Sequence, residues 1–271
     1  MDKLDALLGE PSSDLEASLI RILTFVMFVF SLMVLAEGSE APYGRYARQY
    51  KGGCSYPLNA RVGWFVQEIP AFVMPILCLL LVNVETSKVH SGLTVNGVLL
   101  GGLIAHYTNR SLIYPWLIRG NSPITCITFS FAIVINVVSG YLHGRYLTAF
   151  ATYSEEWLYH PCFISGIVLF FIGMAVNIHA DHLLRMLRNP GETGYKIPRG
   201  GLFEYVSAAN FFAEIIEWLG YGLASWSLVG LILPLLTMCN LLPRAVHHHR
   251  YYHDKFEDYP KDRKAVIPFV L

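Results

Sequence analysis

The chain has 271 residues, of which 54% are hydrophobic and 15% are charged, and its formal net charge is zero. This composition is too apolar for an ordinary water-soluble domain, so that class of protein is excluded. The zero net charge identifies no charged partner, and we expect no nucleic acid to bind.

Seven apolar runs approach the roughly 20 residues that a helix needs to cross a bilayer. They cover residues 15–36, 62–84, 93–114, 123–142, 162–184, 204–225 and 228–246. The N-terminus lacks the basic start and the small-residue cleavage site of a signal peptide, so the first run is expected to be retained. The sequence therefore predicts a single all-α transmembrane domain over residues 1–271, with seven membrane-spanning helices.

Positively charged residues are distributed unevenly between the segments that flank these helices. They gather in 45–61, in 185–199 and in 250–264, whereas the segments on the opposite side hold only Lys88 and Arg145 between helices. Because positive residues favour the cytoplasmic side, we expect the N-terminus outside and the C-terminus in the cytoplasm. Seven spans of a multi-pass protein satisfy this bias, and an even number does not.

A carboxylic acid and two tyrosines fall inside the second and third runs. Glu68 lies about two turns inside the membrane, and Tyr107, Arg110 and Tyr114 share one helix face. Burial in an apolar environment favours the protonated form of a carboxyl group, which can then donate a hydrogen bond. A carboxyl group beside a tyrosine can polarise a ketone, but a hydrogen bond between packed helices explains the same residues equally well.

The fifth run ends in a polar stripe. Asn177, Asp181, Arg185 and Arg188 are spaced by four, four and three residues, which places them on one helix face. The amide and the carboxylate lie deep enough to hydrogen-bond a sugar or an amide, whereas a helix end emerging into water is the simpler alternative. The segment 189–203 that follows is rich in glycine and proline, so it predicts either an ordered anion-binding turn or a plain connector.

The sixth run also carries a polar face, formed by Asn210, Glu214 and Glu217. Two carboxylates inside an apolar helix need charged or hydrogen-bonding partners. The seventh run and its basic extension hold polar residues one turn apart: Arg244, His248 and Tyr252. We expect Arg244 or its neighbours to face Glu214 or Glu217.

Ten histidines raise the rival possibility of a membrane di-iron oxygenase. Two clusters lie near the cytoplasmic side, in 179–182 and 247–253, but the third cluster that such enzymes need is missing. The five cysteines include no Cys-x-x-Cys pair and are expected to pack as small core residues. We therefore expect no metal site.

Several motifs together resemble the steroid 5α-reductase family, and the resemblance covers most of the chain. The matching pieces are Gln67-Glu-Ile-Pro70, His106-Tyr107 with Arg110, Asn177-Ile-His-Ala-Asp181, Asn189-Pro-Gly-Glu192, Ile197-Pro-Arg-Gly-Gly-Leu-Phe203, Asn210-Phe-Phe-Ala-Glu-Ile-Ile-Glu-Trp218, His247-His-His-Arg250, Phe256-Glu-Asp-Tyr-Pro260 and Ile267-Pro-Phe269. The match is strongest from Asn177 to Leu271, and the spacing resembles that of a bacterial member. The first helix and the loop 37–61 match least, so their role stays open.

The resemblance implies a seven-helix membrane enzyme, expected as a monomer, that uses NADPH to reduce the carbon-4 to carbon-5 double bond of a 3-oxo-Δ4-steroid. In such enzymes hydride is added at carbon 5, the 3-oxo group is polarised into an enolate, and a proton is added at carbon 4. Glu68 and Tyr107 correspond to the residues that hold the 3-oxo group, and Tyr114 is expected to be a further substrate contact.

The resemblance also implies a cofactor half, residues 162–271, with its site facing the cytoplasm. The cofactor pocket corresponds to Arg110, Asn177, Asp181, Arg188, Tyr195, Asn210, Glu214, Arg244, His248 and Tyr252. Arg188 and Arg244 are the candidates for pairing with the 2′-phosphate that distinguishes NADPH from NADH.

Related activities compete with this interpretation. Membrane enoyl-CoA, sterol and polyprenol reductases share the architecture, and so do isoprenylcysteine methyltransferases, which should lack the Gln-Glu-x-Pro piece. A non-enzymatic sterol-binding membrane protein is a further alternative, but it would need no second charged pocket for a dinucleotide. The resemblance implies a lipid-like enone as the substrate class and leaves the physiological substrate open.

Overall fold

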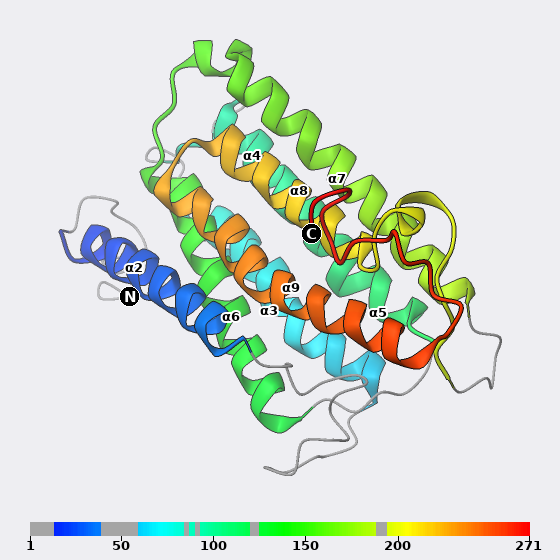
Figure 1. Cartoon of the computed structure of the whole chain (residues 1–271). Helices are drawn as coiled ribbons and strands as arrows, with labels where there is room; N and C mark the ends of the chain where they lie inside the picture. Colours follow the sequence, from blue (N-terminus) through cyan, green and yellow to red (C-terminus); the bar gives the residue numbers. More distant parts are fainter. Residues whose placement is uncertain (1–13, 39–58, 84–86, 90–92, 120–124, 188–193) are drawn as a thin grey trace.

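The computed structural model describes residues 14–38, 59–83, 87–89, 93–119, 125–187 and 194–271, whose regular secondary structure is helical with no strand (Figure 1). The α-helices are α2 (Asp14–Glu37), α3 (Ala60–Leu81), α4 (Val95–Tyr107), α5 (Tyr114–Leu117), α6 (Cys126–Arg145), α7 (Pro161–Met186), α8 (Ala209–Ser225) and α9 (Leu228–Lys255). The short π and 3-10 segments are η1 (Thr108–Ile113), η2 (Tyr146–Phe150), η3 (Glu155–Tyr159) and η4 (Gly201–Glu204).

Five helices are long and apolar enough to cross a membrane, namely α2, α3, α6, α7 and α9. This confirms an all-helical, multi-pass membrane architecture. The other two predicted spans are shorter than expected: α4 has 13 residues and α8 has 17. The predicted start of the run 204–225 was too early, since α8 begins at Ala209. The number of crossings and the orientation of the termini stay predictions.

The third apolar run is interrupted by the π-helical segment η1. A π turn contains one residue more than an α turn, so it rotates the residues that follow relative to those before it. The Ser111 hydroxyl in η1 donates to the backbone carbonyl of Glu68 at 3.0 Å, which ties this segment to α3. Tyr107 and Tyr114 therefore do not share the single helix face with Arg110 that regular α-helical spacing predicts, because the π turn lies between them. π turns of this kind occur frequently at functional sites.

Helices α7 and α8 lie side by side (Figure 1) and approach each other through glycines. A Cβ atom on Gly173 would meet the backbone nitrogen of Glu217, and one on Gly220 would meet the backbone nitrogen of Phe170. Any larger residue at these two glycines would force the helices apart. Close backbone approach through small residues is a common way for membrane helices to associate.

Arg145, expected in an outer loop, is instead the last residue of α6 and is only 2% exposed. Its guanidinium contacts Glu16 of α2 twice, with Nε 2.7 Å from Oε1 and Nη2 2.9 Å from Oε2. The expectation was wrong because a bidentate partner on another helix satisfies a charge that the local sequence leaves unpaired. This ion pair joins α2 to α6.

The C-terminal tail folds back over the start of α8 (Figure 1). The Ser207 backbone N–H donates to the Lys264 carbonyl at 2.8 Å, and Arg263 donates to the Pro198 carbonyl at 2.8 Å. In the adjoining segment the Gly200 backbone N–H donates to the Glu204 carboxylate. This hydrogen bond, together with the positive charge of Arg263, holds the pKa of Glu204 below its ordinary value. The tail therefore orders the segment that leads into α8.

Candidate active site

Arg110 lies at the centre of a buried charged cluster that joins three elements. Its Nη1 is 3.0 Å from Oδ2 of Asp181 in α7, and its Nη2 is 3.3 Å from Oε2 of Glu214 in α8. The three side chains are 12%, 4% and 17% exposed, respectively. A single cation thus compensates two carboxylates on neighbouring helices, which makes Arg110 the link between η1 and the α7–α8 pair.

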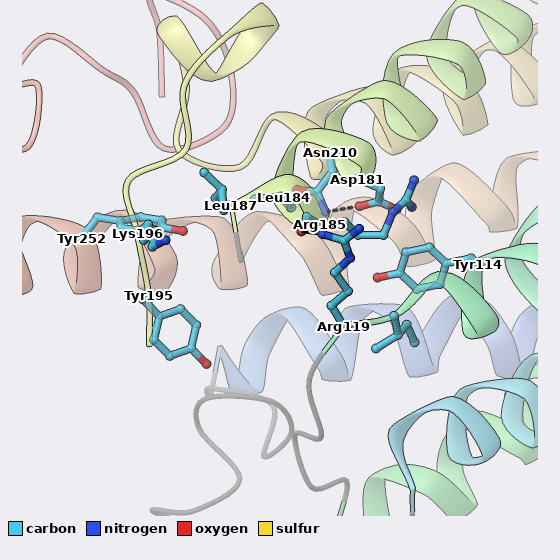
Figure 2. Close-up of a pocket in the computed structure, with 11 residues that line it drawn as sticks. Tyr114, Arg119, Asp181, Leu184, Arg185, Leu187, Tyr195, Lys196, Asn210 and Tyr252 are labelled. Atoms are coloured by element: carbon cyan, nitrogen blue, oxygen red, sulfur yellow. Dashed lines mark hydrogen bonds between the residues drawn. The ribbon is translucent and has the colours of Figure 1, made fainter. Parts of the chain in front are cut away.

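Two asparagines complete the hydrogen bonding of this cluster. The Asn210 amide donates to Oδ1 of Asp181 at 3.1 Å (Figure 2), and the Asn177 amide donates to the Asn210 carbonyl at 2.9 Å. Both oxygens of Asp181 are therefore engaged, one by a cation and one by an amide. The four-residue spacings predicted from the sequence bring these residues to the interface between α7 and α8.

Aromatic rings cover the Arg110 guanidinium. Its central carbon lies 4.8 Å from the Tyr114 ring centroid and 5.3 Å from that of Trp64, and these two rings are 5.2 Å apart. The Trp64 Nε1 is buried and has no hydrogen-bond partner within the described part of the chain. Sequence reasoning missed Trp64, and the only available signal was its position one turn before Glu68 in α3.

Glu68 and Tyr107 adjoin the same cluster. The Gln67 amide donates to Oε1 of Glu68 at 3.1 Å, while the Gln67 carbonyl accepts from Asn136 of α6 at 2.6 Å. Tyr107 is 7% exposed, and Glu68 and Arg110 are among the ionisable groups that lie near its hydroxyl. A carboxyl group, a phenol and a buried cation from α3, α4 and η1 thus gather around one region.

The expected partner of the α8 carboxylates is not Arg244. Glu214 pairs with Arg110, and Glu217 pairs with His106, whose Nδ1 lies 2.6 Å from Oε1. The Arg244 guanidinium instead lies over the Phe211 ring at 5.3 Å, and the His248 ring is 5.4 Å from that same ring. The prediction failed because the α8 carboxylates face α4 and η1, an arrangement that helix periodicity alone does not specify.

A cavity of about 210 Å³ opens beside this cluster at the end of α7 (Figure 2). It is lined by Tyr114, Ile118, Arg119, Asp181, Leu184, Arg185, Leu187, Tyr195, Lys196, Asn210 and Tyr252. Four of the predicted cofactor residues therefore line one cavity, and the expected substrate contact Tyr114 lines it too. Arg188 lies outside the described residues.

Three cations of the cavity were not among the predicted cofactor residues, although each lies in or beside a basic segment near a helix end. They are Arg119, Arg185 and Lys196. Arg119 also donates to the Arg185 carbonyl at 3.3 Å, which joins the end of the third apolar run to α7. Guanidinium groups suit phosphate, aromatic rings suit a base, and the amide and carboxylate suit a ribose or a carboxamide. The donor set fits a phosphate-bearing nucleotide, and the volume accommodates one portion of a dinucleotide.

The histidines do not form a metal centre in the part of the chain that the structure describes. No group of three or more His, Cys, Asp or Glu side chains there could hold a metal ion. His179 and His182 are exposed on α7, whereas His249 of α9 accepts or donates a 2.6 Å bond with Ser207. The geometry of these residues gives no support to the di-iron alternative.

Comparisons with known proteins agree with the motifs. A family model described as 3-oxo-5-alpha-steroid 4-dehydrogenase matches residues 120–271. The chain is 49% identical over 253 residues to 3-oxo-5-alpha-steroid 4-dehydrogenase 1 of Rattus norvegicus, covering 93% of this chain and 94% of that protein. It is 50% identical over 250 residues to the protein of that name from Mus musculus, covering 92% and 93%.

The similarity extends to the protein of the same name from Homo sapiens, with 43% identity over 260 residues covering 94% of this chain and 97% of that protein. These relatives are mammalian, so they lend no support to a bacterial origin. The family model covers more than half of the chain, and the identities run through nearly all of it. The chain therefore belongs to the 3-oxo-5-alpha-steroid 4-dehydrogenase family.

Proposed function

We propose that the protein reduces the carbon-4 to carbon-5 double bond of 3-oxo-Δ4-steroids to give 5α-steroids, with NADPH as the reductant. Family membership implies a steroid substrate and a nicotinamide cofactor. The observation that carries the proposal is Arg110, which joins the Asp181 side of the cation-rich cavity to the region of Glu68 and Tyr107. A nucleotide and an enone would meet at that junction.

The chemistry needs a polarised carbonyl. A bound reduced nicotinamide would supply the hydride that adds to carbon 5 of the steroid. Glu68 and Tyr107 would donate hydrogen bonds to the 3-oxo group and stabilise the negative charge that develops on its oxygen. Tyr107 is buried and Glu68 is partly buried, which limits the access of water and strengthens these hydrogen bonds. The proton that completes the reduction at carbon 4 would come from water. Arg110 would orient both regions relative to each other.

The cofactor preference follows from the cations of the cavity. A 2′-phosphate carries negative charge that NADH lacks, and Arg119, Arg185 and Lys196 supply compensating positive charge. Asp181 accepts hydrogen bonds from Asn210 and from Arg110, so its charge is compensated and these two residues of the cavity would meet the uncharged parts of the nucleotide. We infer from this arrangement that NADPH is preferred over NADH.

Purified protein supplied with NADPH is expected to convert 3-oxo-Δ4-steroids to 5α products and to leave enoyl-CoA esters and polyprenals unchanged. The measurement is product analysis by mass spectrometry and chromatography, with NADH in place of NADPH as the matched comparison. Reduction of polyprenals without reduction of steroids would assign the chain to a related membrane reductase. Retention of steroid without any NADPH-dependent product would favour a sterol-binding protein instead.

We propose that the chain crosses the membrane seven times, with the N-terminus outside and the cofactor site facing the cytoplasm. The continuous path from Val95 to Leu117 through α4, η1 and α5 is long enough for one further crossing, and α8 pairs with α7 along its length. The cations Arg119, Arg185 and Lys196 all lie at one end of the bundle, as the positive-inside rule favours.

An accessibility experiment tests this topology. In a background without reactive native cysteines, Tyr159→Cys is expected to react with an impermeant maleimide in intact cells, because residue 159 follows α6 and is 79% exposed. Lys261→Cys, which is also exposed, is expected to react only after the membrane is permeabilised. Labelling of Lys261→Cys in intact cells would place the C-terminus outside and overturn the seven-span arrangement.

A further inference from the structure

A second buried polar pair lies next to the charged cluster of Arg110. The His106 Nδ1 of α4 is 2.6 Å from Oε1 of Glu217 in α8, and the two side chains are 5% and 1% exposed. The other carboxyl oxygen, Oε2, has no hydrogen-bond partner among the described residues. Burying a carboxyl group with one oxygen unsatisfied costs free energy of folding, so helix packing alone does not explain why this pair is present.

The pair and the Arg110 cluster enclose Tyr107. His106 immediately precedes Tyr107 and is tied to Glu217, whereas Arg110 follows it by three residues and is tied to Glu214. Both carboxylates belong to α8, one turn apart. The chain is thus held to α8 on both sides of Tyr107, at the point where α4 gives way to the π turn.

The aromatic packing supplies the direct contact. The His106 ring centroid lies 4.9 Å from that of Tyr107 at an interplanar angle of 82°, and 4.4 Å from that of Trp218 at 57°. The Tyr107 and Trp218 rings are 6.1 Å apart. The imidazole is therefore wedged against both rings, and its rotation is fixed by the bond to Glu217. Because the imidazole cannot rotate, the edge it presents to the Tyr107 ring cannot shift either.

We infer that the His106–Glu217 hydrogen bond holds Tyr107 in the orientation from which its hydroxyl reaches the steroid carbonyl. His106 and Glu217 are then positioning residues that act through Tyr107, and this inference rests on the proposed function. Only one oxygen of Glu217 is used, so the role requires a hydrogen-bonding group at residue 217 and not a negative charge. Glutamine retains that group and nearly the same volume, whereas leucine retains the volume alone.

The test compares Glu217→Leu and Glu217→Gln with the wild-type protein in two measurements. The first is single-turnover hydride transfer at saturating NADPH and steroid. The second needs no turnover: with oxidised cofactor bound, the enone absorption band of the steroid moves to longer wavelength when its carbonyl accepts a strong hydrogen bond. Glu217→Leu is expected to slow hydride transfer on the order of 100-fold, as small misplacements do, and to lose the band shift.

Comparing Glu217→Gln with Glu217→Leu separates a loss of Tyr107 positioning from a general loss of folding or packing. Glu217→Gln is expected to stay within about threefold of the wild type in both measurements, and both variants should keep their NADPH dissociation constant within about threefold. Ile215→Val, a buried α8 substitution that removes one methyl group, controls for loosening of the helix. If Glu217→Leu does not accumulate, His106→Phe/Glu217→Leu, which leaves no polar group of the pair behind, carries the same expectation.

Two results would overturn the inference: wild-type hydride transfer in Glu217→Leu, or a loss in Glu217→Gln as large as that in Glu217→Leu. A loss of NADPH binding in step with the loss of rate would overturn it as well, because the pair would then serve the cofactor site. A wild-type protein that transfers no hydride to steroid would instead refute the proposed function, and the wild-type trace alone reveals that outcome.

Discussion

Tyr107→Phe and Glu68→Gln are each expected to slow hydride transfer by about 10²–10³-fold, because each removes a donor that stabilises charge developing in the transition state. Phenylalanine cannot donate to the 3-oxo group, and an amide is a far poorer acid than a carboxylic acid. Neither side chain lines the cation-rich cavity, so NADPH affinity should be unchanged. The effect should fall on kcat and spare steroid binding in the glutamine variant.

The measurement is single-turnover absorbance decay of the reduced nicotinamide at saturating cofactor. The double variant should lose less than the sum of the two single losses in barrier height, since both donors act on one oxygen. Tyr141→Phe provides a matched control, because the Tyr141 hydroxyl contacts only Glu16, 3.4 Å away, among the hydrogen bonds of the described chain. Near-wild-type rates in both single variants would mean that Glu68 and Tyr107 are packing residues.

Arg110→Ala is expected to lower the free energy of unfolding by about 3–5 kcal/mol, and to weaken cofactor binding because Asp181, which lines the cavity, loses its cation. The substitution leaves Asp181 and Glu214 buried without their cation, and a buried unpaired charge costs more than the pair contributed. The measurement is the thermal unfolding midpoint in detergent without cofactor, together with NADPH binding by fluorescence.

Two further variants make this result specific. Arg110→Ala/Glu214→Gln should recover part of the lost stability, because one of the two unpaired charges is removed, yet it should not recover activity. Arg61→Ala, where the exposed Arg61 Nε donates to the Ile118 carbonyl at 3.2 Å, should change stability by less than about 0.5 kcal/mol. If Arg110→Ala unfolds like the wild type, the two carboxylates are solvated or protonated and the cluster is not an ionic link.

The polar stripes of the helices could be predicted from the sequence because they depend only on helix geometry. Residues four apart share a face, so Asp181 with Asn177, and Glu214 with Asn210, had to appear together once the runs were recognised as helices. The residue that pairs with these stripes across the helix interface could not be predicted in this way. Arg110 joins both stripes, but its position relative to α7 and α8 depends on how the helices pack, which periodicity does not contain.

The remaining errors have the same origin. The π turn η1 could not be predicted, because it is defined by its backbone hydrogen bonds and no residue pattern in Thr108–Ile113 specifies it. Arg145 was assigned to a loop because its partner, Glu16, lies more than a hundred residues away. Trp64 has an ordinary place in an apolar helix, and what distinguishes it is its position beside Arg110 and an indole nitrogen that no described residue hydrogen-bonds. Contacts of this kind are tertiary and cannot be read from one segment.

The glycine contact between α7 and α8 couples the packing of these two helices to the alignment of the polar residues on the cofactor side. Gly173 lies just over two turns before Asp181, and the backbones approach so closely there that a Cβ atom on Gly173 would meet the backbone nitrogen of Glu217. A shift by one residue would place a Cβ atom against the opposing backbone and would also part Asp181 from Asn210. We therefore expect the docking of the two helices in this register and the formation of the Asp181–Asn210 bond to depend on each other.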